Sequence, residues 1–331
     1  MRTLSFRFIV VCAGVLGTAH VAAQTPAGKP AAGAYPAKAI RIVVPYPPGG
    51  TSDILSRLIG AKVTENWGQQ VVVDNRTGAN GNIGAEHTAR SAPDGYTLML
   101  TDIGNLSIAP NVYKLNFDIL KDFVPITTVS YSPHLLTTHP SVPVKNTRDL
   151  IALAKANPGK LNFPTGLGGA PHFAGILFEQ RTGIKWTYIP TRGGADSSRM
   201  VMAGEGDMFF LGMLQTIPHV KSGRLKLIAV SSEKRIASLP DTPTVSEGPG
   251  LAGFVTGSWQ GMLAPARVPA EVVTKLNAEM VRVLALADIK EKLGTQGTEP
   301  VANSSQDTAR WMATETQRMG KLIKDTGFKM E

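Results

Sequence analysis

The sequence predicts an α/β fold with two lobes, each a mostly parallel sheet flanked by helices, hinged by two crossing segments. Three observations support this prediction. Short apolar stretches with strand character alternate with stretches of helical periodicity along most of the chain. Two longer extended stretches, residues 124–139 and 257–263, interrupt this alternation. The last helices follow the second stretch and are expected to return to the first lobe, which leaves a cleft between the lobes.

The chain begins with the parts of a secretory signal peptide. A start that contains Arg2 and Arg7 leads into an apolar run, residues 8–19, and then into small residues. A membrane anchor is the alternative, but the run is shorter than the roughly 20 residues that a membrane span needs. We therefore expect export to the periplasm, with cleavage near Ala23 and Gln24.

Composition after the signal peptide excludes several classes of protein. Cys12 is the only cysteine and lies within the predicted signal, residues 1–23, so no disulfide, thiol nucleophile or cysteine metal site is expected. Residues 24–36, rich in Ala, Pro and Gly, predict a flexible leader. The formal net charge is +9, but the basic residues are scattered, so we do not expect nucleic acid as a partner.

The first lobe is predicted from strands that alternate with helices. The strands are expected at residues 40–44, 71–74 and 97–101, and the helices at residues 51–65 and 83–91. The short apolar strands indicate burial on both faces, as in a parallel sheet.

The second lobe resumes the alternation after the first extended stretch. Its elements are expected, in order, as a helix at 147–156, a strand at 160–164, a helix from about His172, a strand at 186–189, a helix at 195–203, and strands at 208–211 and 225–231. After the second extended stretch, Pro269 opens a strongly amphipathic helix, where proline is well tolerated. We assign residues 37–130 and 257–331 to the first lobe and residues 131–256 to the second.

Three glycine-containing loops each follow a predicted strand and precede a predicted helix. Open α/β sheets place their ligands at this end of the strands. Glycine lets the backbone approach a ligand, and the first free amides of the helix then point at it. The loops therefore predict a carboxylate site, although each could be an ordinary tight turn. The candidate binding residues are Pro48, Gly49, Gly50, Thr51, Ser52 and Asp53; Thr165, Gly166, Gly168, Gly169, Ala170 and His172; and Thr191, Arg192, Gly193 and Gly194.

Three of these candidates have alternative roles. Asp53 would oppose a bare anion, so helix capping and support of the loop are the favoured roles. His172 could bind a ligand or pack as a neutral imidazole, and the second is favoured. Arg192 could add a direct charge to the site or point to solvent.

No catalytic constellation is recognisable in the sequence. Pro171 stands where the dinucleotide-binding fingerprint has glycine, no Walker lysine follows a glycine loop, and no G-x-S-x-G or H-E-x-x-H motif occurs. We expect neither an enzyme nor a bound metal or cofactor. A periplasmic hydrolase is a remote alternative, since it would need a nucleophile–base pair.

Five blocks of sequence closely resemble the Bug family, the extracytoplasmic solute receptors of tripartite tricarboxylate transporters. They are YPAKAIRIVVPYPPGGTSDILSR, VVVDNRTGANGNIGA, PDGYTLML, LPDTPTVSE and SWQGMLAPARVPAEVVTKLNAEM. The resemblance implies a two-lobed periplasmic binding fold that closes on a small organic acid or related compound. It implies that the three loops form the site and that the receptor docks on the permease subunits of the transporter. A periplasmic sensor domain is an alternative partner, and we expect a monomer.

The second-lobe loops depart from the family pattern. Thr191 and Arg192 stand where relatives commonly have Tyr and Lys, and Ala170 replaces a usual Ser or Thr. Asp196 and Met200 replace a common Pro and Asp on the following helix. The changes at Ala170 and Thr191 predict a roomier site, and the four departures together leave the ligand unidentified.

Overall fold

A mixed sheet forms the centre of the protein. The computed structural model describes residues 35–327, so the predicted signal peptide and nearly all of the predicted leader lie outside the described residues. β1 (Ile40–Val44) is the middle of three parallel strands, between β2 (Val71–Asn75) and β3 (Thr97–Asp102). Apart from Arg41, β1 is buried, as its apolar sequence requires of a strand between two neighbours.

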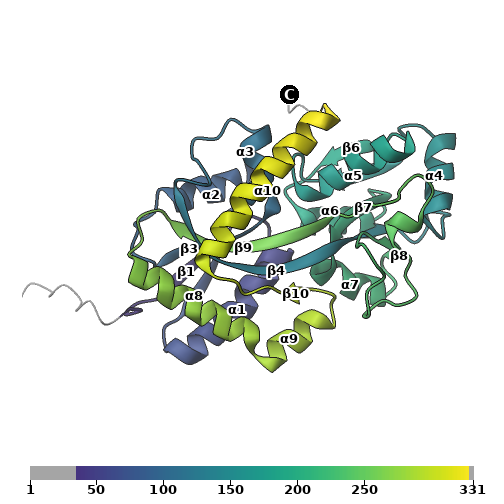
Figure 1. The fold of residues 1–331 in the computed structure, drawn as a ribbon. Coiled ribbons are helices and arrows are strands. Elements are labelled where there is room, and N and C mark those ends of the chain that lie inside the picture. Colours follow the sequence, from purple (N-terminus) through teal and green to yellow (C-terminus); the bar gives the residue numbers. More distant parts are fainter. Residues whose placement is uncertain (1–34, 328–331) are drawn as a thin grey trace, which may run out of the picture. The chain divides into compact units, whose positions relative to one another are not determined.

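Two long strands form the connection that the extended stretches predict. β4 (Phe123–Thr138) pairs antiparallel with β9 (Gly257–Pro265) along most of its first part. Its last residues pair with β7 (Met208–Gly212) and β8 (Lys226–Val230). β9 also pairs with β3, so the two long strands run side by side from β1–β3 to the elements after β4 (Figure 1). The α/β fold is confirmed, and β4 and β9 make the sheet mixed.

The helices pack on both sides of these strands. In Figure 1, α1 (Thr51–Trp67), α8 (Ala270–Ala285) and α9 (Ala287–Gly294) lie below β4 and β9. α2 (Asn82–Ala89), α3 (Ala109–Val112) and most of α10 (Ser305–Thr326) lie above. The one-turn helices η1 (Ala79–Gly81), η2 (Gly104–Ile108) and η3 (Val245–Glu247) and the short strand β10 (Glu299–Pro300) complete these segments.

The segment between β4 and β9 has a core of its own. It contains the two-stranded parallel sheet of β5 (Asn162–Thr165) and β6 (Thr187–Pro190), with α4 (Thr147–Ala156), α5 (Ala170–Thr182), α6 (Gly194–Met202) and α7 (Met213–Lys221). Phe163, Phe178, Phe210 and Phe254 are fully buried together, and the rings of Phe210 and Phe254 stack at 5.7 Å. Burial of each such side chain stabilises the fold by about 1.5–3 kcal/mol.

The C-terminal helices pack against the beginning of the chain. α8 contacts α1 and β4, and α10 contacts β4 and η2. The Asn66 amide on α1 donates to Glu279 on α8 at 2.8 Å, and Lys62 pairs with Asp288 on α9 at 2.9 Å. The described residues from Pro36 onward form a single compact unit, and the lobe boundaries stay a prediction. Of the helices that the structure describes, none is long and apolar enough to cross a membrane.

α7 was not predicted as a helix. Its sequence, MLQTIPHVK, contains Pro218, which lacks an amide hydrogen and weakens the helical signal. Pro218 lies near the end of this short helix, so only the last turn is affected, and the helix forms between β7 and β8.

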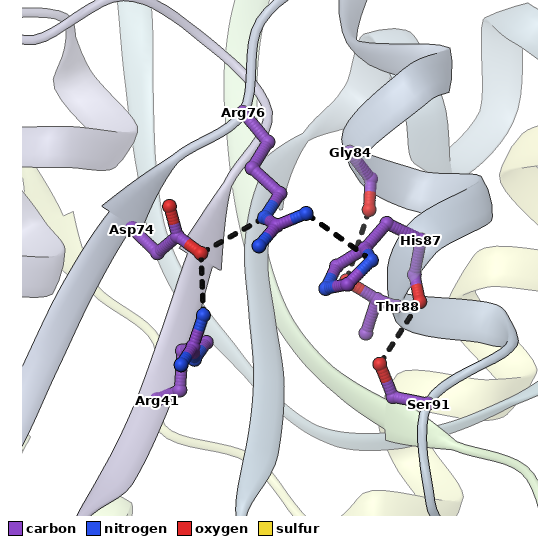
Figure 2. A network of polar contacts seen from close by, with 7 residues as sticks. All are labelled: Arg41, Asp74, Arg76, Gly84, His87, Thr88 and Ser91. Carbon is purple, nitrogen blue, oxygen red and sulfur yellow. Dashed lines mark hydrogen bonds and ion pairs between the residues drawn. The ribbon is translucent and has the colours of Figure 1, made fainter.

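The edge of the sheet at β2 carries charged side chains. Asp74 accepts hydrogen bonds from Arg41 at 2.9 Å and Arg76 at 2.8 Å, and Arg76 reaches the His87 ring at 3.3 Å (Figure 2). Burial alone would raise the pKa of Asp74, but the hydrogen bonds from Arg76 and Arg41 lower it. Charges on an edge strand oppose pairing with another chain, so this network protects the edge.

Candidate functional site

Four strand-to-helix turns meet at one cavity of about 60 Å³. The turns follow β1, β5, β6 and β7 and open α1, α5, α6 and α7. β4 and β9 supply the remaining wall, together with Asn80 and Asp102. The lining residues are Tyr46, Gly50, Thr51, Ser52, Asn80, Asp102, His134, Thr165, Gly166, Gly169, Pro171, Gly193, Gly194, Ser197, Leu211, Gly212, Gln215, Ser258 and Gln260.

All four helices at the cavity begin after a glycine. The N-cap residues are Gly50, Gly169, Gly193 and Gly212, none of which has a side chain that could cap the first amides. In α7 the Ser132 hydroxyl accepts from the Met213 amide instead. By contrast, α4 and α10 lie away from the cavity and are capped by the side chains of Asn146 and Ser304. The helix starts at the cavity are therefore suited to an external acceptor.

Several buried polar atoms at the cavity lack a partner among the described residues. They are Thr51 Oγ1, Asn80 Nδ2, His134 Nε2, Thr165 Oγ1 and Gln215 Oε1. A buried polar group without a hydrogen bond costs about 1–3 kcal/mol. Because such groups are rare in native proteins, five of them around one cavity indicate that it receives a polar guest.

The first predicted loop contributes three residues to the cavity wall. Gly50, Thr51 and Ser52 line it, and the Ser52 hydroxyl donates to Gln260 on β9 at 2.7 Å. Pro48 and Gly49 are exposed and outside the lining, and Gly49 has φ +86°, a conformation that favours glycine.

Asp53 supports the first loop and does not line the cavity. Its carboxylate accepts from the Gly49 amide at 2.9 Å and pairs with Arg57 at 2.9 Å. Burial alone would raise the pKa of Asp53, but the bonds from Arg57 and Gly49 lower it. This is the supporting role that the sequence favours for Asp53.

The second loop, like the first, has some residues that line the cavity and some that do not. Thr165, Gly166 and Gly169 line the cavity, whereas Gly168, Ala170 and His172 do not. Ala170 belongs to a buried apolar cluster.

His172 supports the second loop from outside the cavity wall. Its Nδ1 accepts from the Gly168 amide at 3.0 Å, and its ring meets the Tyr188 ring edge-on at 4.6 Å. Burial lowers the pKa of His172 to about 4, so the imidazole is neutral. This geometry fits the packing role that the sequence favours.

The third loop presents its glycines to the cavity and its arginine to solvent. Gly193 and Gly194 line the cavity. The Arg192 side chain is 71% exposed and pairs with Asp196 at 2.6 Å. Thr191 is not one of the lining residues. Its hydroxyl shares a hydrogen bond of 2.9 Å with the hydroxyl of Ser197, which does line the cavity. The charge of Arg192 is therefore paired with Asp196 on α6 and is not part of the cavity wall.

Sequence reasoning missed the residues that other elements bring to the cavity. Gly212 and Gln215 follow the same strand–glycine–helix pattern as the predicted loops, and this signal was hidden because α7 was not recognised. His134, Ser258 and Gln260 lie on β4 and β9, where extended sequence gives no sign of a site. The other missed lining residues are Tyr46, Asn80, Asp102, Pro171, Ser197 and Leu211.

Asp102 is held at the cavity wall by neutral donors. Its Oδ1 accepts from the Tyr46 hydroxyl at 2.7 Å and from the Gly104 amide at 2.8 Å. Burial raises the pKa of Asp102, and these hydrogen bonds oppose the shift. Burial also raises the pKa of Tyr46, so the phenol stays protonated.

The cavity wall contains no Lys or Arg among the described residues. Its titratable side chains are Tyr46, Asp102 and His134, and burial lowers the pKa of His134 to about 3. An anionic group in this cavity would therefore be held by amides and hydroxyls rather than by a cation.

Comparison with known proteins gives consistent results. Residues 55–328 match the sequence profile of the tripartite tricarboxylate transporter family receptor. The chain is 33% identical over 332 residues to protein BugT of Bordetella pertussis, with 98% of this chain and 99% of BugT covered. The structure of R. palustris Rpa4515 with adipate is 33% identical, covers 89% of this chain and 99% of its own, and has a TM-score of 0.86. The periplasmic binding protein BugD is 30% identical over 90% of this chain and 100% of its own, with a TM-score of 0.85.

Proposed function

The chain belongs to the tripartite tricarboxylate transporter receptor family, and from this premise we propose that it captures a small carboxylate in the cavity and delivers it to a membrane permease. We place this activity in the periplasm. The family consists of solute receptors with a two-lobed binding fold, and binding rather than turnover is the proposed output.

The observation that carries the proposal is the convergence of glycine-capped helix starts on one cavity that has no Lys or Arg in its wall among the described residues. Amides at a helix start carry partial positive charge and donate hydrogen bonds to an anion. Thr51 and Thr165 add hydroxyls that have no other partner among the described residues. The adipate in the Rpa4515 structure supports a carboxylate as the guest.

Ligand binding is proposed to favour the closed arrangement of the two predicted lobes. Tyr113, before β4, donates to the Leu167 carbonyl in the second loop at 2.5 Å. Gly193 of the third loop lies against Pro47, because a Cβ added there would meet Pro47 Cδ at 3.2 Å. A ligand held between such loops shifts the population toward the closed form.

Calorimetric titration of the chain from Gln24 with small carboxylates tests the proposal. Gly50→Val places a side chain at the start of α1, where an added Cβ makes only ordinary contacts, the nearest with the Pro47 carbonyl at 3.5 Å. We expect Gly50→Val to fold and to lose binding. Gly294→Val at the end of α9 is the matched control, because an added Cβ meets nothing within 4 Å. Unchanged affinity in Gly50→Val would remove the first loop from the site.

Delivery to the permease needs a separate test. Deletion of the receptor gene should abolish cellular uptake of the acid that the purified protein binds. Normal uptake after deletion would contradict delivery to a permease and favour the alternative output, docking on a periplasmic sensor domain.

A further inference from the structure

We propose that the ligand carries an ammonium group beside its carboxylate, and that Asp102 is the residue that binds the ammonium. The inference rests on the proposed function and defines the substrate class of the same cavity. Asp102 is the last residue of β3 and lines the cavity. In the pairing of β3 with β9 it lies opposite Gln260, which also lines the cavity.

Asp102 differs from Asp53, Glu279 and Glu315, three other poorly exposed acids, because no cation accompanies it among the described residues. Asp53, Glu279 and Glu315 each pair with an arginine three or four residues further along the chain. Asp102 accepts hydrogen bonds from Tyr46 and from the Gly104 amide, and no ion pair to it occurs among the described residues. A carboxylate removed from water without a cation is unfavourable, so the position calls for a positive partner.

Glu179 is a buried acid that has a structural role and also pairs with no cation among the described residues. Its two oxygens accept from the Trp186 amide at 2.8 Å and the Tyr188 hydroxyl at 3.0 Å, inside the protein and away from the cavity. Asp102 also accepts from neutral donors, the Tyr46 hydroxyl and the backbone amides of Gly104 and Asn105, but it lies in the cavity wall. Its position, unlike that of Glu179, therefore lets a ligand in the cavity reach it.

The charges at the cavity wall determine which ligand balances them. Asp102 is the acidic side chain of the wall, and no Lys or Arg lines the cavity among the described residues. A plain dicarboxylate would bring two negative charges and no cation. A zwitterionic acid would place its ammonium on Asp102 and its carboxylate on the helix amides. The unpartnered Gln215 Oε1 offers a further acceptor for an ammonium hydrogen.

The test compares acids that differ by a single amino group. Calorimetry at pH 7.5 on the chain from Gln24 would use succinate and aspartate, glutarate and glutamate, and butanoate and 4-aminobutanoate. We expect at least one amino acid to bind about 10-fold or more tightly than its partner, because a buried charge pair adds specificity of this order. Asp102→Asn keeps the size of the side chain and an acceptor oxygen, and should reduce that ratio by at least 10-fold. Asp94→Asn, at an exposed pair with Lys38, is the control and should leave the ratio unchanged.

The outcomes separate this inference from the proposed function. If plain acids bind as tightly as amino acids, or if Asp102→Asn leaves the ratio unchanged, the inference is overturned while the carboxylate receptor stands. If a plain dicarboxylate binds more tightly at pH 5 than at pH 7.5 and Asp102→Asn abolishes this change, Asp102 is a protonated donor and the inference is also overturned. If no acid of either kind binds to folded protein, both conclusions fail.

Discussion

Thr165→Val is expected to stabilise the free protein and weaken ligand binding. The Thr165 side chain is 1% exposed, and its hydroxyl lines the cavity without a partner among the described residues. Valine has nearly the same shape, so the substitution removes an unsatisfied polar atom and opens no hole.

The magnitudes follow from the hydroxyl. An unsatisfied buried polar group costs about 1–3 kcal/mol. Thr165→Val can therefore raise the free energy of unfolding by at most this amount. In a chain of this size each kcal/mol raises Tm by about 2 °C. Loss of a hydrogen bond to the ligand costs about 0.5–1.5 kcal/mol, which weakens Kd by roughly 2- to 12-fold.

A matched variant separates the two effects. The Thr137 hydroxyl on β4 is also fully buried and unpartnered among the described residues, but Thr137 does not line the cavity. Thr137→Val should raise Tm in the same way and leave Kd unchanged. Thr182→Val should lower Tm, because the Thr182 hydroxyl donates to the Phe178 carbonyl at 2.6 Å.

Differential scanning fluorimetry without ligand and calorimetry with a bound carboxylate measure both quantities. A fall in Tm for Thr165→Val, with Kd unchanged, would refute the reasoning, because the hydroxyl would then be satisfied in the free protein and unused by the ligand.

Two further predictions concern closure and pH. Tyr113→Phe removes the hydrogen bond to Leu167 and should weaken Kd by about 3- to 10-fold in calorimetry; an unchanged Kd would contradict a role for this contact in closure. Burial lowers the pKa of His172 to about 4 and that of His134 to about 3, so the unfolded chain binds more protons than the folded chain between those values and about 6.5. Stability is therefore complete above pH 6.5 and falls as the pH drops toward 4, by up to about 1.4 kcal/mol per pH unit for each histidine. Urea midpoints at pH 7 and pH 4.5 test this, and His134→Gln should reduce the difference; equal midpoints in the native chain would contradict it.

The strand-to-helix turns could be predicted because their signals are local. A short apolar strand, one or two glycines and a helical repeat stand next to one another in sequence, as in the stretch around Gly50. The same pattern at Gly212 was missed because Pro218 obscured the helix that follows it. The departures of the second-lobe loops from the family pattern were visible in the sequence, but their structural role was not. Arg192 and Asp196 pair with each other, and Gly193 and Gly194 are the residues that line the cavity.

By itself, the sequence determined the α/β alternation, the two long extended segments and the glycines that open the helices at the cavity. Each of these depends on propensities and spacings within about ten residues of chain, which one sequence displays directly. Tertiary structure alone decided the chemistry of the cavity wall. Asp102 ends an ordinary strand, and His134 and Gln260 lie within β4 and β9. These side chains reach the cavity because β3, β4 and β9 are neighbours in one sheet, although they are far apart in sequence. Asp102 owes its proposed role to its burial and to the absence of a nearby cation among the described residues. Both are properties of that packing and not of any stretch of sequence.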